Sequence, residues 1–134
     1  MAVGERMSRS LPDQPETRID LSVPGVDSHL GVIRTVVGRA AMIAGFTFDG
    51  IEDFALAIHE AAALLLTSAP DRVMMSLWAD ADVLFVELRV DGGDGTWTAR
   101  DLGEDIRWNL LNALCDRVWL LEGQVGIGLS QSKR

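Results

Sequence analysis

Apolar residues recur every three or four positions in three segments of this chain, which predicts three amphipathic helices. The segments are 30–44, 51–65 and about 104–114. Asp27 or Ser28 is expected to cap the first helix and Asp49 the second, because short polar side chains bond the free amides of a first helical turn. The third helix is expected to bury four large apolar residues: Ile106, Leu110, Leu111 and Leu114.

Apolar and polar residues alternate in five other segments, which predicts strands with one buried face. These segments are 17–21, 73–77, 84–90, 118–120 and 125–129. A tight turn at 80–82 joins the second and third strands into a hairpin, and a polar tail is expected over 131–134. Strands that cluster together, with helices able to cover one of their faces, favour an α/β two-layer sandwich over a doubly wound parallel sheet.

Composition favours a single compact domain, because the 134 residues are 48% hydrophobic. We expect this domain at 17–130, after a flexible N-terminal tail over 1–16. No uncharged apolar run reaches the roughly 18 residues of a membrane helix, and the N-terminal segment lacks the apolar stretch of a secretory signal. We therefore expect a cytoplasmic protein. A single cysteine, Cys115, excludes an internal disulfide, and no Cys/His cluster has the spacing of a structural zinc site.

The charge balance limits the class of partner. Twenty acidic and 12 basic side chains give a formal net charge of −8. Such a surface repels phosphate backbones, so direct nucleic-acid binding is disfavoured. A basic protein partner is favoured instead, because opposite net charge raises the rate of encounter.

Two short motifs could carry chemistry. Glu60 lies in the second predicted helix, within AIHEAAALLL, and a D-x-G-x-G turn follows a predicted strand at 91–95. Taken alone, Glu60 is typical of a solvated helix surface. The turn, taken alone, is typical of a strand end in which glycines adopt positive φ. Neither motif by itself indicates a function.

In this order the two motifs resemble the Bergerat (GHKL) ATP-binding fold, and specifically the small anti-sigma factor kinases of the RsbW and SpoIIAB type. The resemblance covers 17 to about 129. It implies a histidine-kinase-like ATPase fold, with a mixed, mainly antiparallel sheet covered on one face by helices. It also implies Glu60 as the general base of phosphoryl transfer. The adenine end of the nucleotide site would use Asp91, Gly93 and Gly95.

Two departures from the family pattern concern the nucleotide. The family motif E-x-x-x-N has a magnesium-binding asparagine where this chain has Leu64, and an apolar side chain cannot ligate a hard cation. The two phosphate-binding glycines of the family fall on Asp105 and Arg107, and a carboxylate repels polyphosphate. We therefore expect a degenerate pseudo-kinase with no metal site and with Glu60 vestigial, in which ATP and magnesium are possible but disfavoured cofactors. The pattern WNLLNALCDRVWLLEG is most similar to the mycobacterial anti-sigma-F factor branch.

The resemblance implies three partners: an alternative sigma factor that is sequestered, a STAS-domain anti-anti-sigma antagonist that releases it, and a second copy in a homodimer. The family's first helix carries an arginine that contacts the sigma factor, and Arg34 in VIRTVV matches it. The expected contact patch is Leu30, Arg34, Val37 and Gly38. A solvated arginine on a helix surface is the alternative for Arg34.

Two other functions stay open on the sequence. One is an active protein-serine kinase that phosphorylates its antagonist, with Glu60 as the base. The other is an unrelated α/β interaction module, which would bind no sigma factor.

Overall fold

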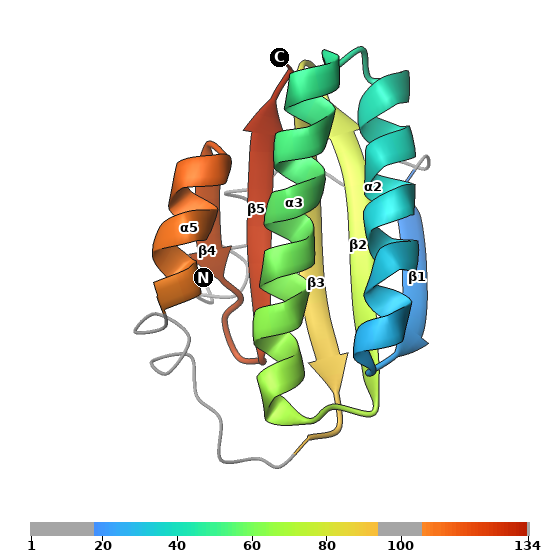
Figure 1. Ribbon diagram of the computed structural model, residues 1–134, viewed down its shortest axis with the longest axis vertical. Coiled ribbons are helices and arrows are strands. Elements are labelled where there is room, and N and C mark those ends of the chain that lie inside the picture. Colours follow the sequence, from blue (N-terminus) through green and yellow to red (C-terminus); the bar gives the residue numbers. More distant parts are fainter. Residues whose placement is uncertain (1–17, 94–105, 134) are drawn as a thin grey trace, which may run out of the picture.

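The computed structural model describes residues 18–93 and 106–133, in which three helices cover one face of a five-stranded sheet (Figure 1). The strands are β1 (Ile19–Pro24), β2 (Arg72–Asp80), β3 (Val83–Asp91), β4 (Arg117–Leu120) and β5 (Gly126–Ser132). The helices are α2 (Leu30–Ile43), α3 (Phe48–Leu65) and α5 (Ile106–Leu114), with 3-10 turns η1 (Asp27–His29) and η2 (Leu66–Ser68). The expected α/β architecture is confirmed, whereas the expected tail over 1–16 lies outside the described residues.

The sheet has the order β1-β2-β3-β5-β4, and each of these neighbouring pairs is antiparallel. The expectation of a mixed sheet is therefore wrong for the part of the chain that the structure describes. The chain reverses direction at each step from β1 through α2 and α3 to β2, so β1 and β2 run oppositely. β3 and β4 run in the same direction, but β5 lies between them and pairs with both.

The core lies between the helices and the inward face of the sheet. Val86 of β3 lies opposite Leu77 of β2 on one side and Leu129 of β5 on the other. All three are at most 1% exposed, and they belong to the same buried cluster as Phe54 and Ile58 of α3. Burying one such side chain contributes about 1.5–3 kcal/mol relative to leaving it in water. The alternation in the sequence predicted this face of the hairpin correctly.

The starts of the first two helices differ from the expected caps. Thr47 caps α3, because its backbone is extended and its hydroxyl accepts a hydrogen bond from the amide of Gly50 at 3.2 Å. Asp49 lies in the first turn instead, where its charge is favourable against the helix dipole. Asp27 and Ser28, the expected caps of the first helix, lie within the 3-10 turn η1, which leads directly into α2. Among the described contacts, no side chain caps the start of η1 or the start of α2.

Helix α5 buries less of its apolar surface than expected. Leu111 is fully buried, but Ile106 is 82% exposed and Leu110 is 41% exposed. Neighbouring residues of a helix point about 100° apart, so Leu110 turns away when Leu111 faces the core. Trp108 packs against the core from the same helix. The expected burial of Ile106 and Leu110 is therefore wrong.

The last strand extends beyond its predicted end. β5 continues to Ser132, and Gln131 is 2% exposed within it. The side-chain oxygen of Gln131 accepts from the amide of Asp116 at 3.1 Å, and the amide of Ser132 donates to the Asp116 carboxylate at 2.9 Å. These bonds hold the two polar residues in the sheet, so the expectation of a polar tail beginning at 131 is wrong.

Ala81→Gly is expected to raise the free energy of unfolding. Ala81 has a φ of 53° in the turn between β2 and β3, a left-handed conformation that a Cβ disfavours by about 1 kcal/mol. Glycine adopts it without that cost but loses more freedom on folding, so the net gain is about 0.5 kcal/mol. Urea unfolding measures the difference. Ala79→Gly, within β2, is the matched control and should lose stability; equal losses in both variants would contradict the prediction.

Candidate functional site

Helix α3 carries two of the positions that the family motif singles out. Glu60 and Leu64 lie one turn apart on the same side of the helix, because residues four apart share a face. Glu60 is partly exposed, at the border of the core, whereas Leu64 is 1% exposed inside it. The position expected to bind magnesium in the family is therefore a core position in this chain.

The glycine-rich turn after β3 packs against the end of the helical segment that includes α3 and η2. Gly93 has a φ of 114°, and a Cβ there would lie 2.8 Å from the carbonyl oxygen of Ser68. Both the backbone conformation and the close approach therefore require glycine. The amide of Asp71 donates to the carbonyl of Asp91 at 2.8 Å. These contacts place the exposed Asp91 at the same end of the molecule as the last turns of α3.

Helix α2 carries the four residues expected to contact a partner, and the structure separates them into two pairs. Leu30 and Val37 are fully buried in the core, because they fall on the apolar stripe of the helix. They are therefore wrong as contact residues. Arg34 is exposed and Gly38 is partly exposed, and both line an open groove between α2 and α3.

The described residues include no group of three or more histidine, cysteine, aspartate or glutamate side chains that could hold a metal ion. Over the same residues, no helix combines the length and the apolar character needed to span a bilayer. Cys115 is 5% exposed, and its thiol donates to the carbonyl of Leu111 at 3.2 Å. It therefore packs as a small buried residue of the core.

The chain is similar to a known protein kinase over most of its length. It is 30% identical over 138 aligned positions to the protein "Serine-protein kinase RsbW" of Halalkalibacterium halodurans, with 90% of this chain and 84% of that protein covered. The chain belongs to the RsbW family. No family model matches the sequence. Membership in the RsbW family confirms the resemblance carried by the two motifs and contradicts the interpretation as an unrelated interaction module.

The structure describes only some of the residues expected to form a nucleotide site. Of these residues, Glu60 lies on α3, Asp91 is the last residue of β3, and Gly93 follows that strand. Gly95 and Asp105 lie outside the described residues. Leu64 does not fit a magnesium ion, because its side chain has no oxygen and is packed in the core. The residue expected at the family's metal position therefore does not fit a magnesium ion.

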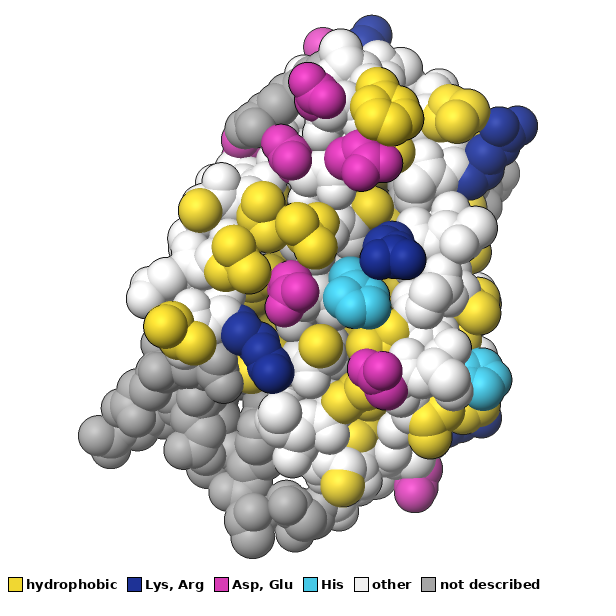
Figure 2. Space-filling view, in the orientation of Figure 1, with side chains coloured by type: hydrophobic (Ala, Val, Ile, Leu, Met, Phe, Trp, Pro, Cys, Tyr) yellow, Lys and Arg dark blue, Asp and Glu magenta, His cyan; other side chains and the backbone are white. Residues whose placement is uncertain are grey.

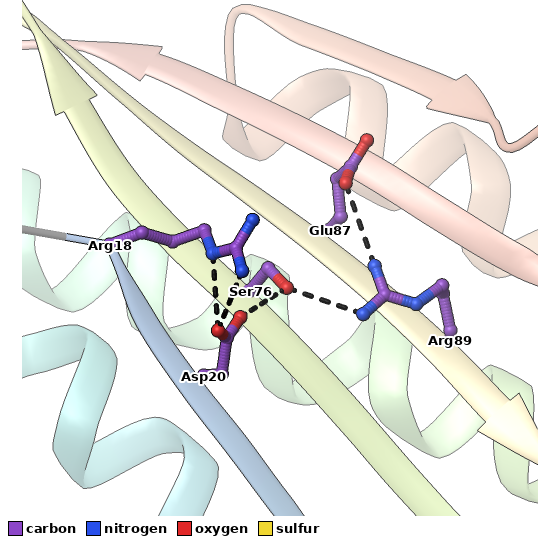
Figure 3. A network of polar contacts seen from close by, with 5 residues as sticks. All are labelled: Arg18, Asp20, Ser76, Glu87 and Arg89. Atoms are coloured by element: carbon purple, nitrogen blue, oxygen red, sulfur yellow. Dashed lines mark hydrogen bonds and ion pairs between the residues drawn. The ribbon is translucent and has the colours of Figure 1, made fainter. Parts of the chain in front are cut away.

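The outward face of the sheet carries a polar network that the sequence pattern did not predict (Figure 3). Arg18 and Asp20 form an ion pair at 3.0 Å, and the hydroxyl of Ser76 donates to Asp20 at 2.7 Å. Arg89 donates to the same hydroxyl at 3.3 Å and lies 3.6 Å from Glu87. The Ser76 hydrogen bond and then Arg18 lower the pKa of Asp20, whereas burial raises the pKa of Glu87 despite Arg89. Three strands contribute to this network, so only their register reveals it.

Glu87→Gln is expected to stabilise this RsbW-family protein at neutral pH. The raised pKa means that Glu87 favours folding while protonated, and this contribution is lost as the pH rises through its folded-state pKa. The variant and the wild type should therefore unfold with similar free energies at about pH 4, and the variant should be more stable at about pH 7.

Urea unfolding at both pH values measures this difference. Asp20→Asn is the control of opposite sign, because the lowered pKa of Asp20 stabilises the fold above its unfolded-state pKa. That variant should lose stability at neutral pH. A Glu87→Gln effect that does not change with pH would contradict the assignment.

Two aromatic contacts lie on the same outward face of the sheet. Trp78 stacks on Phe85, with ring centroids 5.6 Å apart and 9° between the ring planes. Trp119 lies over the backbone of Gly128, its partner across β4 and β5. The guanidinium of Arg117 stands 5.6 Å from the centroid of the Trp119 ring. Glycine at 128 is therefore required by the close approach of an indole.

Proposed function

We propose that this chain is an anti-sigma factor, which binds and sequesters an alternative sigma factor in the cytoplasm until a STAS-domain anti-anti-sigma antagonist releases it. Membership in the RsbW family carries the proposal, because the similarity extends over 90% of the chain. Arg34 supports it: the side chain is exposed on α2 and forms no ion pair with a described residue. Inhibition in this proposal comes from occupying the surface of the sigma factor and needs no chemical step.

The net charge supports a basic partner. The chain carries a formal charge of −8, and the DNA-contacting regions of a sigma factor are basic because they meet phosphates. Opposite charges raise the association rate more than they raise the final affinity. The rate at which the sigma factor associates should therefore fall as salt is added.

We also propose that phosphoryl transfer is lost. Leu64 stands at the expected magnesium position and is buried in the core. In the sequence, Asp105 stands where a phosphate-binding glycine is expected. Phosphoryl transfer depends almost entirely on positioning and on neutralising the phosphate charge. Without the metal ligand and the phosphate cradle, the rate falls by orders of magnitude, and Glu60 is vestigial.

The alternative is an active serine-protein kinase that phosphorylates its antagonist. The relative is named for that activity, and Glu60 and Asp91 keep the general-base and adenine positions of the motif. Calorimetric titration with ATP, with and without magnesium, separates the two functions. Absent or magnesium-independent binding supports the pseudo-kinase, whereas tight magnesium-dependent binding establishes the alternative.

Affinity capture from a native lysate tests sequestration. The tagged wild-type chain is expected to retain an alternative sigma factor, and Arg34→Ala is expected to retain about fivefold less, because it truncates a proposed contact. Asp82→Ala, at an exposed site in the β2–β3 turn, is the control and should retain as much as the wild type. Capture of no sigma factor by the wild type would contradict the function. Equal capture by Arg34→Ala would contradict only the contact.

We propose further that two copies form a homodimer, as the resemblance implies. Light scattering on the purified chain should then give a mass near twice 14.6 kDa at micromolar concentration. A mass of a single chain would contradict this part of the proposal.

A further inference from the structure

The groove between α2 and α3 holds charges of both signs that do not pair with each other. Its volume is about 550 Å³, and its lining residues come from α2 and α3. Arg34 lines it from α2, and Glu52 and Asp53 line it from α3. All three side chains are exposed, and none forms an ion pair with a described residue. These charges are therefore free to pair across an interface.

Apolar residues of α3, Ile51 and Ala55, also line the groove. On its α2 side the groove is lined by Gly38, which has no side chain. A Cβ at Gly38 would lie 3.8 Å from Ile51, an ordinary contact distance, so packing within this chain does not require a glycine. Glycine inside a helix costs about 1 kcal/mol relative to alanine. Across the groove, Ala55 is buried and Leu56 is 41% exposed. A glycine at 38 leaves room on the α2 side of the groove, and Leu56 offers an exposed apolar contact on the α3 side.

The surrounding helix face has the composition of an interface (Figure 2). Acidic side chains gather at its upper end, over the start of α3, with apolar side chains below them. The exposed acids of this end are Asp49, Glu52 and Asp53. Among the exposed large hydrophobic side chains of the helices, Leu56 lines the groove and Phe48 lies at the start of α3. A partner that is both apolar and basic therefore complements this face.

We infer that an amphipathic helix of the sigma factor lies in the groove between α2 and α3, with a basic side chain toward Glu52 and Asp53 and an acidic one toward Arg34. This inference rests on the proposed function. It adds the acidic side of the groove, formed by Glu52 and Asp53, and the kind of segment that binds there. An amphipathic helix can lay its apolar face along the groove between two helices, with residues at i, i+3 and i+4 meeting the floor. Because the groove carries two acids and one arginine, we expect the contact between these acids and a basic side chain of the partner to contribute more than the contact at Arg34.

Dissociation constants with the captured sigma factor test this inference. The double variant Glu52→Lys/Asp53→Lys is expected to bind about tenfold more weakly or worse. The double variant Asp27→Lys/Glu122→Lys makes the same change in net charge at exposed sites that do not line the groove, and it should bind within about threefold of the wild type. Thermal unfolding followed by circular dichroism establishes that each variant is folded.

A reversed charge in the sigma factor completes the test. Replacing the basic residue of the docked helix by glutamate should restore binding to Glu52→Lys/Asp53→Lys while weakening binding to the wild type. Equal weakening by the groove variant and by its control would overturn the inference, because general charge attraction would then suffice. Undiminished binding by a folded groove variant would also overturn it and would leave the proposed function intact. Absence of sigma binding by the wild type would contradict the proposed function itself.

Discussion

Leu64→Asn is expected to lower the free energy of unfolding by about 3–5 kcal/mol and to create no magnesium site. The substitution restores the residue of the family motif, but Leu64 is 1% exposed within the core. An amide there loses the apolar contacts of leucine and places a polar group inside the core. A domain of this size is stable by about 5–15 kcal/mol, so the variant keeps only part of its stability. Urea unfolding followed by circular dichroism measures the loss.

A second position on the same helix provides the matched control. Leu56 is 41% exposed on α3, and Leu56→Asn is expected to cost less than about 1 kcal/mol. Neither variant should gain magnesium-dependent ATP binding in calorimetry. A stable Leu64→Asn protein that binds ATP only with magnesium would contradict the placement of Leu64 in the core and the pseudo-kinase proposal together.

Gly128→Ala is expected to lower the free energy of unfolding by about 1–3 kcal/mol. Trp119 lies opposite Gly128 across β4 and β5, and an added Cβ would overlap the indole ring. Either the ring or the two strands must move, and the contact between the ring and Arg117 is disturbed. Thermal and urea unfolding of the variant measure this cost.

A double-mutant cycle identifies the cause. If the indole is the obstacle, Gly128→Ala should cost much less in a Trp119→Ala background than in the wild type. Gly31→Ala is the control: a Cβ at Gly31 meets no atom within 4 Å, and alanine favours the helix, so stability should hold or rise. Equal effects of Gly128→Ala in both backgrounds would show that Trp119 is not responsible.

The elements predicted from the sequence are those with one face against the core. Helices α2 and α3 and the β2–β3 hairpin were predicted close to their observed positions, because burial of one face imposes the period that the sequence shows. Helix α5 shows the limit of this argument. Ile106 and Leu110 have the spacing of a buried face, yet they are exposed, because α3 meets the side that carries Leu111. Periodicity does not say which apolar side a neighbouring element covers.

The candidate site was predicted less completely, because its residues come from separate segments. Leu30 and Val37 were assigned to the contact patch for their nearness to Arg34 in sequence, although the helical period already placed them on the buried face. Glu52 and Asp53 line the same groove as Arg34 from another helix, and no local pattern in the sequence connects them. The same holds for the network on the outward face of the sheet, which depends on the register of three strands.

We propose that this RsbW-family chain sequesters a sigma factor without phosphoryl transfer. Calorimetric titration of the purified sigma factor into the purified chain, with and without ATP and magnesium, tests it most directly. Sequestration without phosphoryl transfer should give a saturable complex whose dissociation constant is the same in both conditions. Binding that requires magnesium and ATP, or no complex in either condition, would contradict it.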